Sequence, residues 1–345
     1  MPPVSRRRRA AGADDEAVPS SAAELLALAA TLLPAASTAT APIRAPPRLK
    51  KLVHSLPDSH PVLLSLPQAL EPPLSEGSGS GCPRAAAVLL HLVLIHPSHS
   101  PRWDDLLPPL ALLHDRLAQL ATDDPPLAAL AVACFEIVWR AAVPGRDALV
   151  AQTLPYLFAQ ALTCGSSARP VLRRLFALRD ALALLDYDDN SISDFKLLLL
   201  RCFVSPLFLK AEEGRKLLAF VLSVSEGLAR EGLELIRAQV GMMGVKRAAL
   251  VAYGEVVFRA WKDGGWVRGE VGEVFLQGML EAAVHAGSKD VPKAARKLLW
   301  PFVEQRTVAG VEKLVFRLAE PVLFRSLQVC VLSCSALVLF LSVCI

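Results

Sequence analysis

Four basic residues recur at helical spacing in the segment that begins at Lys289. Lys289, Lys293, Arg296 and Lys297 occupy positions i, i+4, i+7 and i+8, and an α-helix places such positions on one face. Lysine and arginine on one face can neutralise DNA phosphates without reading sequence, in a salt-sensitive way. The alternative interpretation is an ordinary solvated helix face. No aromatic residue lies between these cations, so the segment itself does not indicate stacking of single-stranded bases.

A second basic cluster lies near the start of the chain. Arg6, Arg7, Arg8 and Arg9 fall within residues 1–20, a polar and charged stretch whose composition predicts disorder. Such a run is typical of a nuclear localisation signal or of an arm that binds nucleic acid. A solvated tail without a ligand is the alternative. No apolar core follows the arginines, so the sequence does not predict a secretory signal.

An acidic segment resembles the beginning of a calcium-binding loop but does not complete it. Asp186, Asp188 and Asn190 have the spacing of the first ligands. The glycine and the final glutamate that such a loop requires are both missing. The sequence therefore predicts an acidic turn between helices, with Ser191 or Ser193 as a helix cap.

Other residue types that could support catalysis or metal binding are scattered. His91, His96, His99 and His114 lack the spacing of a metal site and are interpreted as surface or loop histidines. The seven cysteines contain no C-x-x-C pair, which favours a reducing compartment over a disulfide framework. No nucleotide-binding glycine loop and no nucleophile motif occurs. We expect neither an enzyme nor a cofactor.

The elements that would position the basic face are predicted to be helices throughout. The chain is 53% hydrophobic and 6% aromatic, and its apolar residues recur at helical spacing, as in Leu217, Val221, Val224 and Leu228. Helices joined by tight turns recur at roughly 35 to 45 residues per pair, which is typical of HEAT or armadillo repeats. The predicted fold is an all-α solenoid of stacked helix pairs.

Four regions are predicted along the chain. Residues 1–20 form the basic tail, 21–140 a helical region broken by prolines, 141–328 the solenoid repeats, and 329–345 an apolar tail. Prolines such as Pro67, Pro72 and Pro73 are expected to interrupt the helices of the second region. Trp261, Trp266 and Trp300 are expected to lie in the core or to line a groove between helices.

Three phrases carry a resemblance to a known family. They are LLLLRCFVSPLFLKAEEGRKLLAFVLSV, LVAYGEVVFRAWKDG and VEKLVFRLAEPVLFRSLQV. Together they resemble the HEAT-repeat G-type subunit of the condensin II complex, in a plant-like form, over about residues 170–329. The resemblance implies a non-catalytic subunit that binds the kleisin and other condensin subunits and contacts DNA non-specifically. It implies a role in chromosome condensation and segregation in mitosis and meiosis, in the nucleus and on chromatin, and it carries over no catalytic residue.

The last twenty residues depart from the family's pattern. Residues 326–345 contain no charged side chain and are long enough to span a bilayer as a helix. We interpret this stretch as the product of a truncation, so a membrane partner is not expected. The alternatives are a tail-anchored helical membrane protein and a solenoid adaptor of another kind.

Overall fold

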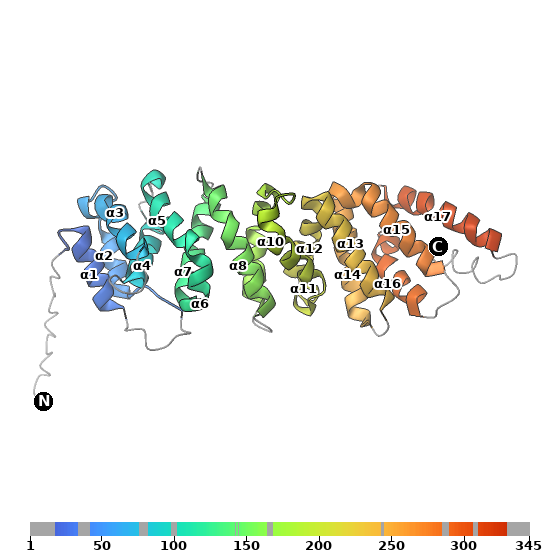
Figure 1. Ribbon diagram of the computed structural model, residues 1–345, viewed down its shortest axis with the longest axis horizontal. Coiled ribbons are helices and arrows are strands. Elements are labelled where there is room, and N and C mark those ends of the chain that lie inside the picture. Colours follow the sequence, from blue (N-terminus) through green and yellow to red (C-terminus); the bar gives the residue numbers. More distant parts are fainter. Residues whose placement is uncertain are drawn as a thin grey trace, which may run out of the picture. The chain divides into compact units, whose positions relative to one another are not determined.

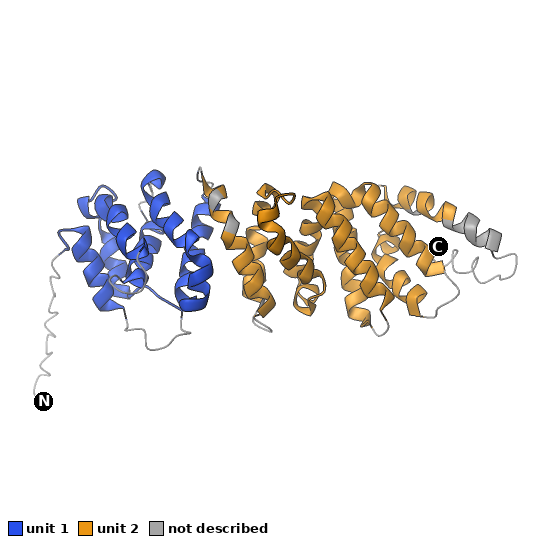
Figure 2. Cartoon of the chain, viewed as in Figure 1, with its two compact units in different colours: residues 1–144 blue, residues 145–345 orange. Residues whose placement is uncertain are grey.

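The computed structural model describes the chain in ten stretches, and the regular elements within them are all helices. The described residues are 18–33, 42–75, 82–97, 102–141, 143, 145–163, 168–242, 245–284, 290–305 and 310–329. No strand occurs in these stretches. The chain divides into two compact units, residues 1–144 and 145–345 (Figure 2).

Unit 1 is built from helices that pack in two rows (Figure 1). One row runs from α1 through α3 to α5, the other from α2 through α4 to α7, and α3 also packs against α4. The helices are α1 (Ala22–Leu32), α2 (Pro47–Ser55), α3 (Pro61–Ser75), α4 (Pro83–Leu94), α5 (Trp103–Asp115), α6 (Leu117–Asp123) and α7 (Pro125–Arg140).

Helix α3 continues through prolines that were expected to interrupt it. Pro67, Pro72 and Pro73 all lie within its fifteen residues, although an interior proline removes a backbone hydrogen bond at a cost of about 3 kcal/mol. The helix buries an apolar stripe that includes Leu66 and Leu70, both inaccessible to solvent. Tertiary packing therefore overrides local propensity, and the expected breaks at these three prolines were wrong.

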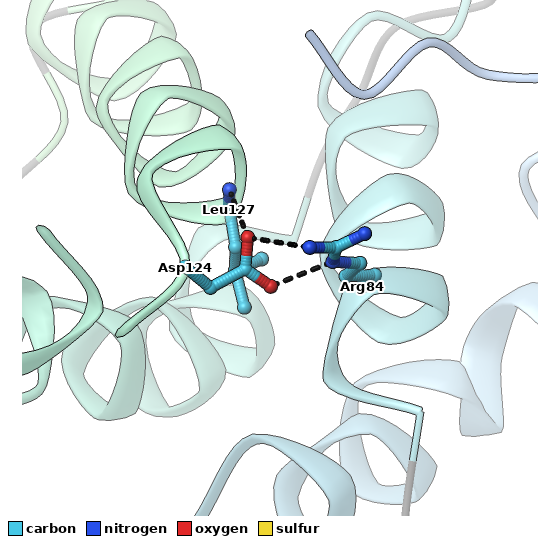
Figure 3. Close-up of polar contacts among 3 residues, drawn as sticks. All are labelled: Arg84, Asp124 and Leu127. Carbon is cyan, nitrogen blue, oxygen red and sulfur yellow. Dashed lines mark hydrogen bonds and ion pairs between the residues drawn. The ribbon is translucent and has the colours of Figure 1, made fainter. Parts of the chain in front are cut away.

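A polar contact joins two helices of unit 1. Arg84 on α4 forms two bonds to the Asp124 carboxylate: Nε donates to Oδ2 at 2.6 Å and Nη2 to Oδ1 at 2.9 Å (Figure 3). The same carboxylate accepts a hydrogen bond from the backbone N–H of Leu127 at 3.2 Å and so caps α7. The pairing raises the pKa of the Arg84 guanidinium. One carboxylate thus fixes both the start of α7 and its contact with α4.

Unit 2 repeats the two-row arrangement. Helices α8, α10, α13, α15 and α17 form one row, and α9, α12, α14 and α16 form the other. Their bounds are η1 (Arg146–Leu149), α8 (Val150–Thr163), α9 (Ala168–Ala177), η3 (Arg179–Leu184), η4 (Asn190–Ile192), α10 (Ser193–Phe203), α11 (Pro206–Lys210), α12 (Glu212–Val224), α13 (Glu226–Gly241), α14 (Arg247–Asp263), η5 (Gly265–Arg268), α15 (Glu270–Val284), α16 (Asp290–Glu304) and α17 (Val311–Val329).

The core of unit 2 uses residues from the phrase that carried the resemblance. Tyr253 on α14 is buried, and its hydroxyl donates to the carbonyl of Phe203 at 2.9 Å. Burial raises the pKa of Tyr253 to about 12. Trp261 and Phe258 pack against Phe302 of α16, with ring centroids 5.9 Å and 5.0 Å from it. These contacts join α14 to helices before and after it in the chain.

The predicted all-α fold of stacked helix pairs is confirmed within each unit. The division of the chain into four regions, with boundaries at 20, 140 and 328, stays a prediction. The arginines at positions 6–9 lie outside the described residues, as do Lys289 and residues 330–345 of the predicted apolar tail.

Candidate nucleic-acid interface

Helix α16 presents its cations on the side opposite its buried stripe. Lys293 and Arg296 are exposed and Lys297 is half-buried, whereas Leu298 and Phe302 lie in the core. The Arg296 Nε donates to the carbonyl of Pro292 at 3.2 Å, one turn earlier. The helical spacing predicted for these three residues therefore puts them on a solvent-facing surface. Their contact with DNA phosphates stays a prediction.

The neighbouring helix adds a cation that the sequence analysis did not include. Arg247 is the first residue of α14, and its charge acts on Lys297 of α16. The pKa of Lys297 is lowered, first by partial removal of the ammonium from water and then by the positive charges of Arg247 and Lys293. We refer to Arg247, Lys293, Arg296 and Lys297 as the α14–α16 basic cluster.

A glycine sets how closely these two helices approach. A Cβ at Gly254 would collide with the carbonyl of Leu298, and Pro301 Cδ would lie 3.2 Å from it. Only a glycine lets the α14 backbone come this near to α16. This close approach lies on the same two helices that carry Arg247 and Lys297.

Other junctions within unit 2 carry ion pairs. Arg215 Nε lies 2.6 Å from Glu255 Oε2 between α12 and α14. Comparable pairs are Arg173–Glu213, Lys196–Glu231 and Arg317–Glu273. At the α14–α16 junction, no carboxylate of the described residues forms an ion pair with the basic cluster. Opposed cations without an acidic partner favour a bound anion.

A pattern search along the chain could not have found Arg247. It lies fifty positions before Lys297, and only the stacking of α14 on α16 brings their charges together. The only feature of the sequence that could have indicated Arg247 as part of this surface was the Lys246–Arg247 pair at the beginning of a predicted helix. Lys246 is the N-cap of α14, and its side chain forms no capping hydrogen bond.

A groove of about 770 Å³ lies on the other row, between α13, η5 and α15. Trp266, whose exposed fraction is 44%, lines the groove together with Val274, which is 65% exposed. The charged side chains along it include carboxylates. They are Glu226, Arg230, Glu234, Arg237 and Glu270. Arg230 pairs with Glu226 at 2.6 Å and Arg237 with Glu234 at 3.5 Å, so the groove lacks the uncompensated positive charge of the basic cluster.

The three tryptophans considered in the sequence occupy different environments. Trp261 is buried in the core and Trp266 lines the groove, as expected. Trp300 is 56% exposed on α16, so the expectation of a core position was wrong for it. It projects from the same solvent-facing side as Lys293 and Arg296.

Two histidines are more buried than predicted. His96 is 4% exposed because its ring bridges two segments: Nδ1 lies 2.8 Å from Asp58 Oδ1 and Nε2 lies 3.1 Å from the carbonyl of Val53. His114 is 6% exposed and packs edge-on against Phe135. Both serve the packing of unit 1. His96 lies in the loop after α4, as predicted, although it is buried there, whereas the surface or loop interpretation was wrong for His114, which lies within α5. His99 lies outside the described residues.

The acidic turn before α10 is a capping structure. The carboxylate of Asp189, and not a serine, accepts from the backbone N–H of Ser191 at 2.9 Å and from its hydroxyl at 2.7 Å. The backbone bond is the main cause that lowers the pKa of Asp189. Within the described part of the chain, no group of three or more potential ligands is placed to hold a metal ion.

None of the helices traced in the described stretches is both long and apolar enough to cross a bilayer. The tail-anchor alternative concerned residues 326–345, of which 330–345 lie outside those stretches.

Comparison with known proteins identifies relatives of this chain. Residues 201–343 match the family model described as condensin II non structural maintenance of chromosomes subunit. Condensin-2 complex subunit G2 of Mus musculus is 29% identical over 192 residues, which are 55% of this chain and 16% of the relative. The Danio rerio protein of the same name is 30% identical over 199 residues, 56% and 17% of the two chains. The Homo sapiens protein is 29% identical over 158 residues, 45% and 14%.

The matched region spans less than a fifth of the length of these curated relatives. No solved structure matches the chain significantly. The family model covers most of unit 2, including α14, α16 and the basic cluster. By these matches, residues 201–343 are similar to the condensin II non-SMC subunit family, and about half of the chain is similar to condensin-2 complex subunit G2.

Proposed function

We propose that this chain is a non-catalytic scaffold of condensin II that contacts DNA through the α14–α16 basic cluster. It would act in chromosome condensation and segregation in mitosis and meiosis, in the nucleus and on chromosomes. Its partners would be the kleisin and other condensin subunits. The similarity to the condensin II non-SMC subunit family and to condensin-2 complex subunit G2 supports the complex and the process. The charges on α14 and α16 suit a phosphate ligand.

The observation that carries the DNA contact is the concentration of positive charge that forms no ion pair with a carboxylate of the described residues. The positive charges of Arg247 and Lys293 both contribute to the lowered pKa of Lys297, so each lies close enough to repel the Lys297 ammonium. Bound phosphates would relieve this repulsion and release counterions from the DNA. The first turn of α14 begins at Arg247 without a side-chain cap and adds partial positive charge at the same place.

The first experiment measures duplex DNA binding by the full chain at several salt concentrations. A triple variant, Arg247→Gln, Lys293→Gln and Lys297→Gln, removes three charges from the surface. We expect weaker binding and a slope of log affinity against log salt that falls by about 0.9 for each phosphate that is no longer neutralised. Fluorescence anisotropy of a labelled DNA duplex measures both the affinity and its dependence on salt.

A matched control removes the same charge elsewhere in unit 2. Lys216→Gln, Arg230→Gln and Arg237→Gln replace three cations that form ion pairs within their own helices. Such surface pairs contribute little to stability. The proposal requires the control to keep the salt slope of the unaltered chain. Equal reductions in both variants would show that net charge, and not this surface, determines binding.

The proposed partner is tested separately by co-purification of the full chain with the kleisin of condensin II. We expect retention at moderate salt in the absence of DNA. A chain that is folded by circular dichroism and is not retained would contradict the kleisin contact for this part of the family. That result would leave the DNA measurement unaffected.

A further inference from the structure

We infer that the α14–α16 surface binds single-stranded nucleic acid, with Trp300 stacking on an unpaired base. This inference rests on the proposed function and deepens it, because the same cations would hold the phosphates. The inferred ligand differs from duplex DNA, because the site requires an unpaired base next to the phosphates that the cations contact. The residues that carry it are Trp300 and the basic cluster.

Trp300 is placed among the cations by helix geometry. It follows Arg296 by four positions and Lys297 by three, and residues at those separations are neighbours on a helix surface. Lys293 lies two turns before it, about 10 Å along the axis at ~1.5 Å per residue. The exposed indole thus continues the stripe of positive charge.

The indole is available to a ligand. More than half of Trp300 is exposed, and the buried side of α16 is supplied by other residues, Leu298 and Phe302 among them. A base stacked on it would remove its face from water, and stacking of this kind is tolerant of base identity.

The combination distinguishes single strands from duplexes. In a duplex the bases are already stacked on one another, so an exposed indole beside the backbone finds no free base face. Single-strand sites combine a cationic surface that follows phosphates with aromatic rings that take bases. The α14–α16 surface has both components, whereas a contact to duplex phosphates would need only the cations.

Carboxylates mark the limits of the surface along α16. Asp290 is the first residue of the helix and Glu304 its last, and both are exposed. Their negative charge disfavours phosphates beyond either end. The strand is therefore expected to pass from Trp300 across Lys297 towards Arg247 on α14.

The test compares a single-stranded oligothymidylate with a duplex of the same length, using the full chain. We expect Trp300→Ala to weaken binding of the oligothymidylate about tenfold, as stacking on one aromatic ring contributes. Its affinity for the duplex should stay within about twofold, because phosphate contacts alone hold the duplex. Trp300→Phe should retain part of the single-strand affinity, because a phenyl ring still stacks.

Trp266→Ala provides the matched control, since it also removes an exposed tryptophan from unit 2. Trp266 lies in the groove lined by Glu226, Glu234 and Glu270, where phosphates are disfavoured. The control should leave oligothymidylate binding unchanged. In the unaltered chain, oligothymidylate should quench tryptophan emission, and this quenching should persist in Trp266→Phe and be reduced in Trp300→Phe.

The outcomes separate this inference from the proposed function. If Trp300→Ala weakens both ligands equally, or neither, base stacking is overturned while the duplex contact can still stand. If duplex binding is absent but oligothymidylate binding depends on Trp300, the duplex contact fails and the single-strand site stands. If the triple cation variant binds oligothymidylate as tightly as the unaltered chain, the shared surface is refuted.

Discussion

Two neighbouring junctions of unit 2 use charge in opposite ways. Between α12 and α14, Arg215 faces Glu255 at 2.6 Å, and opposite charges hold the helices together. Between α14 and α16, the pKa of Lys297 is lowered first by partial removal of its ammonium from water and then by the positive charges of Arg247 and Lys293, which repel it. Both junctions involve α14. Its charges attract α12 at one junction and repel α16 at the other.

The difference shows where packing must substitute for electrostatics. At the repelling junction, α14 and α16 approach closely through Gly254 and pack three aromatic rings, those of Phe258, Trp261 and Phe302. Burial of aromatic surface contributes far more than a surface ion pair. The α14–α16 junction can therefore tolerate cations that form no ion pair with the described carboxylates. Unpaired cations do not help two helices to pack, but a surface that binds anions requires them.

The largest expected effect comes from disturbing the approach at Gly254. In Gly254→Ala the new methyl group meets backbone atoms of Leu298, which cannot yield as a flexible side chain can. We expect a decrease of about 1–3 kcal/mol in the free energy of unfolding, the usual range for overpacking. Urea denaturation followed by circular dichroism measures it.

Gly241→Ala serves as the control for Gly254→Ala. Gly241 is the last residue of α13, and a Cβ there would meet nothing within 4 Å. Alanine reduces the entropy of the unfolded chain without a clash, so stability should be unchanged or slightly raised. Similar destabilisation in both variants would contradict the role of Gly254 as the point of close approach.

A smaller effect is expected at the attracting junction. Glu255→Gln removes the charge partner of Arg215, which also donates to the carbonyl of Leu209 at 2.9 Å and therefore stays in place. The pair is partly exposed, with side-chain exposures of 20% and 41%, so solvent screens it. We expect a decrease of about 1 kcal/mol in the free energy of unfolding, measured by the same denaturation.

An ion pair within α13 provides the control for Glu255→Gln. Glu234 and Arg237 lie 3.5 Å apart on one helix, with side-chain exposures of 65% and 60%. Glu234→Gln should leave stability unchanged, because such exposed pairs contribute nothing measurable in many cases. If Glu255→Gln behaves like Glu234→Gln, the ion pair between α12 and α14 does not stabilise the junction.

The helices and the cations of α16 could be predicted from the sequence, whereas the surface they form could not. Helical periodicity and the spacing of Lys293, Arg296 and Lys297 are local properties, because each depends on residues within two turns. The phrase AYGEVVFRAW indicated the family, and the structure gives its physical reason: Tyr253 and Trp261 are packing residues of α14.

The features that the sequence did not predict depend on contacts between helices distant in the chain. Arg247 joins the basic cluster only because α14 stacks on α16. Trp300 is exposed on α16, whereas the aromatic contacts of that helix to α14 are made by Phe302. His96 is buried because Val53 and Asp58, about forty positions earlier, bracket its ring. In these cases, the periodicity of the sequence identifies neither the residues that a side chain contacts nor how far that side chain is exposed to solvent.

The smallest effect on stability is expected from reversing one charge at the repelling junction. Lys297→Glu replaces repulsion from Arg247 and Lys293 by attraction and so makes α14–α16 resemble α12–α14. We expect a slightly higher midpoint of thermal unfolding together with weaker DNA binding. The two readouts should move in opposite directions, because the charge that disfavours the fold is the one that favours the ligand.

Salt provides the second measurement on Lys297→Glu. In the unaltered chain, salt screens the repulsion between Lys297 and Arg247, so the junction should gain stability as ionic strength rises. In Lys297→Glu the same salt screens an attraction, and the change should have the opposite sign. A variant that unfolds at a lower temperature than the unaltered chain at low salt would show that Arg247 and Lys297 do not oppose each other in solution. The basic cluster would then lack the electrostatic repulsion on which its role as an anion-binding surface depends.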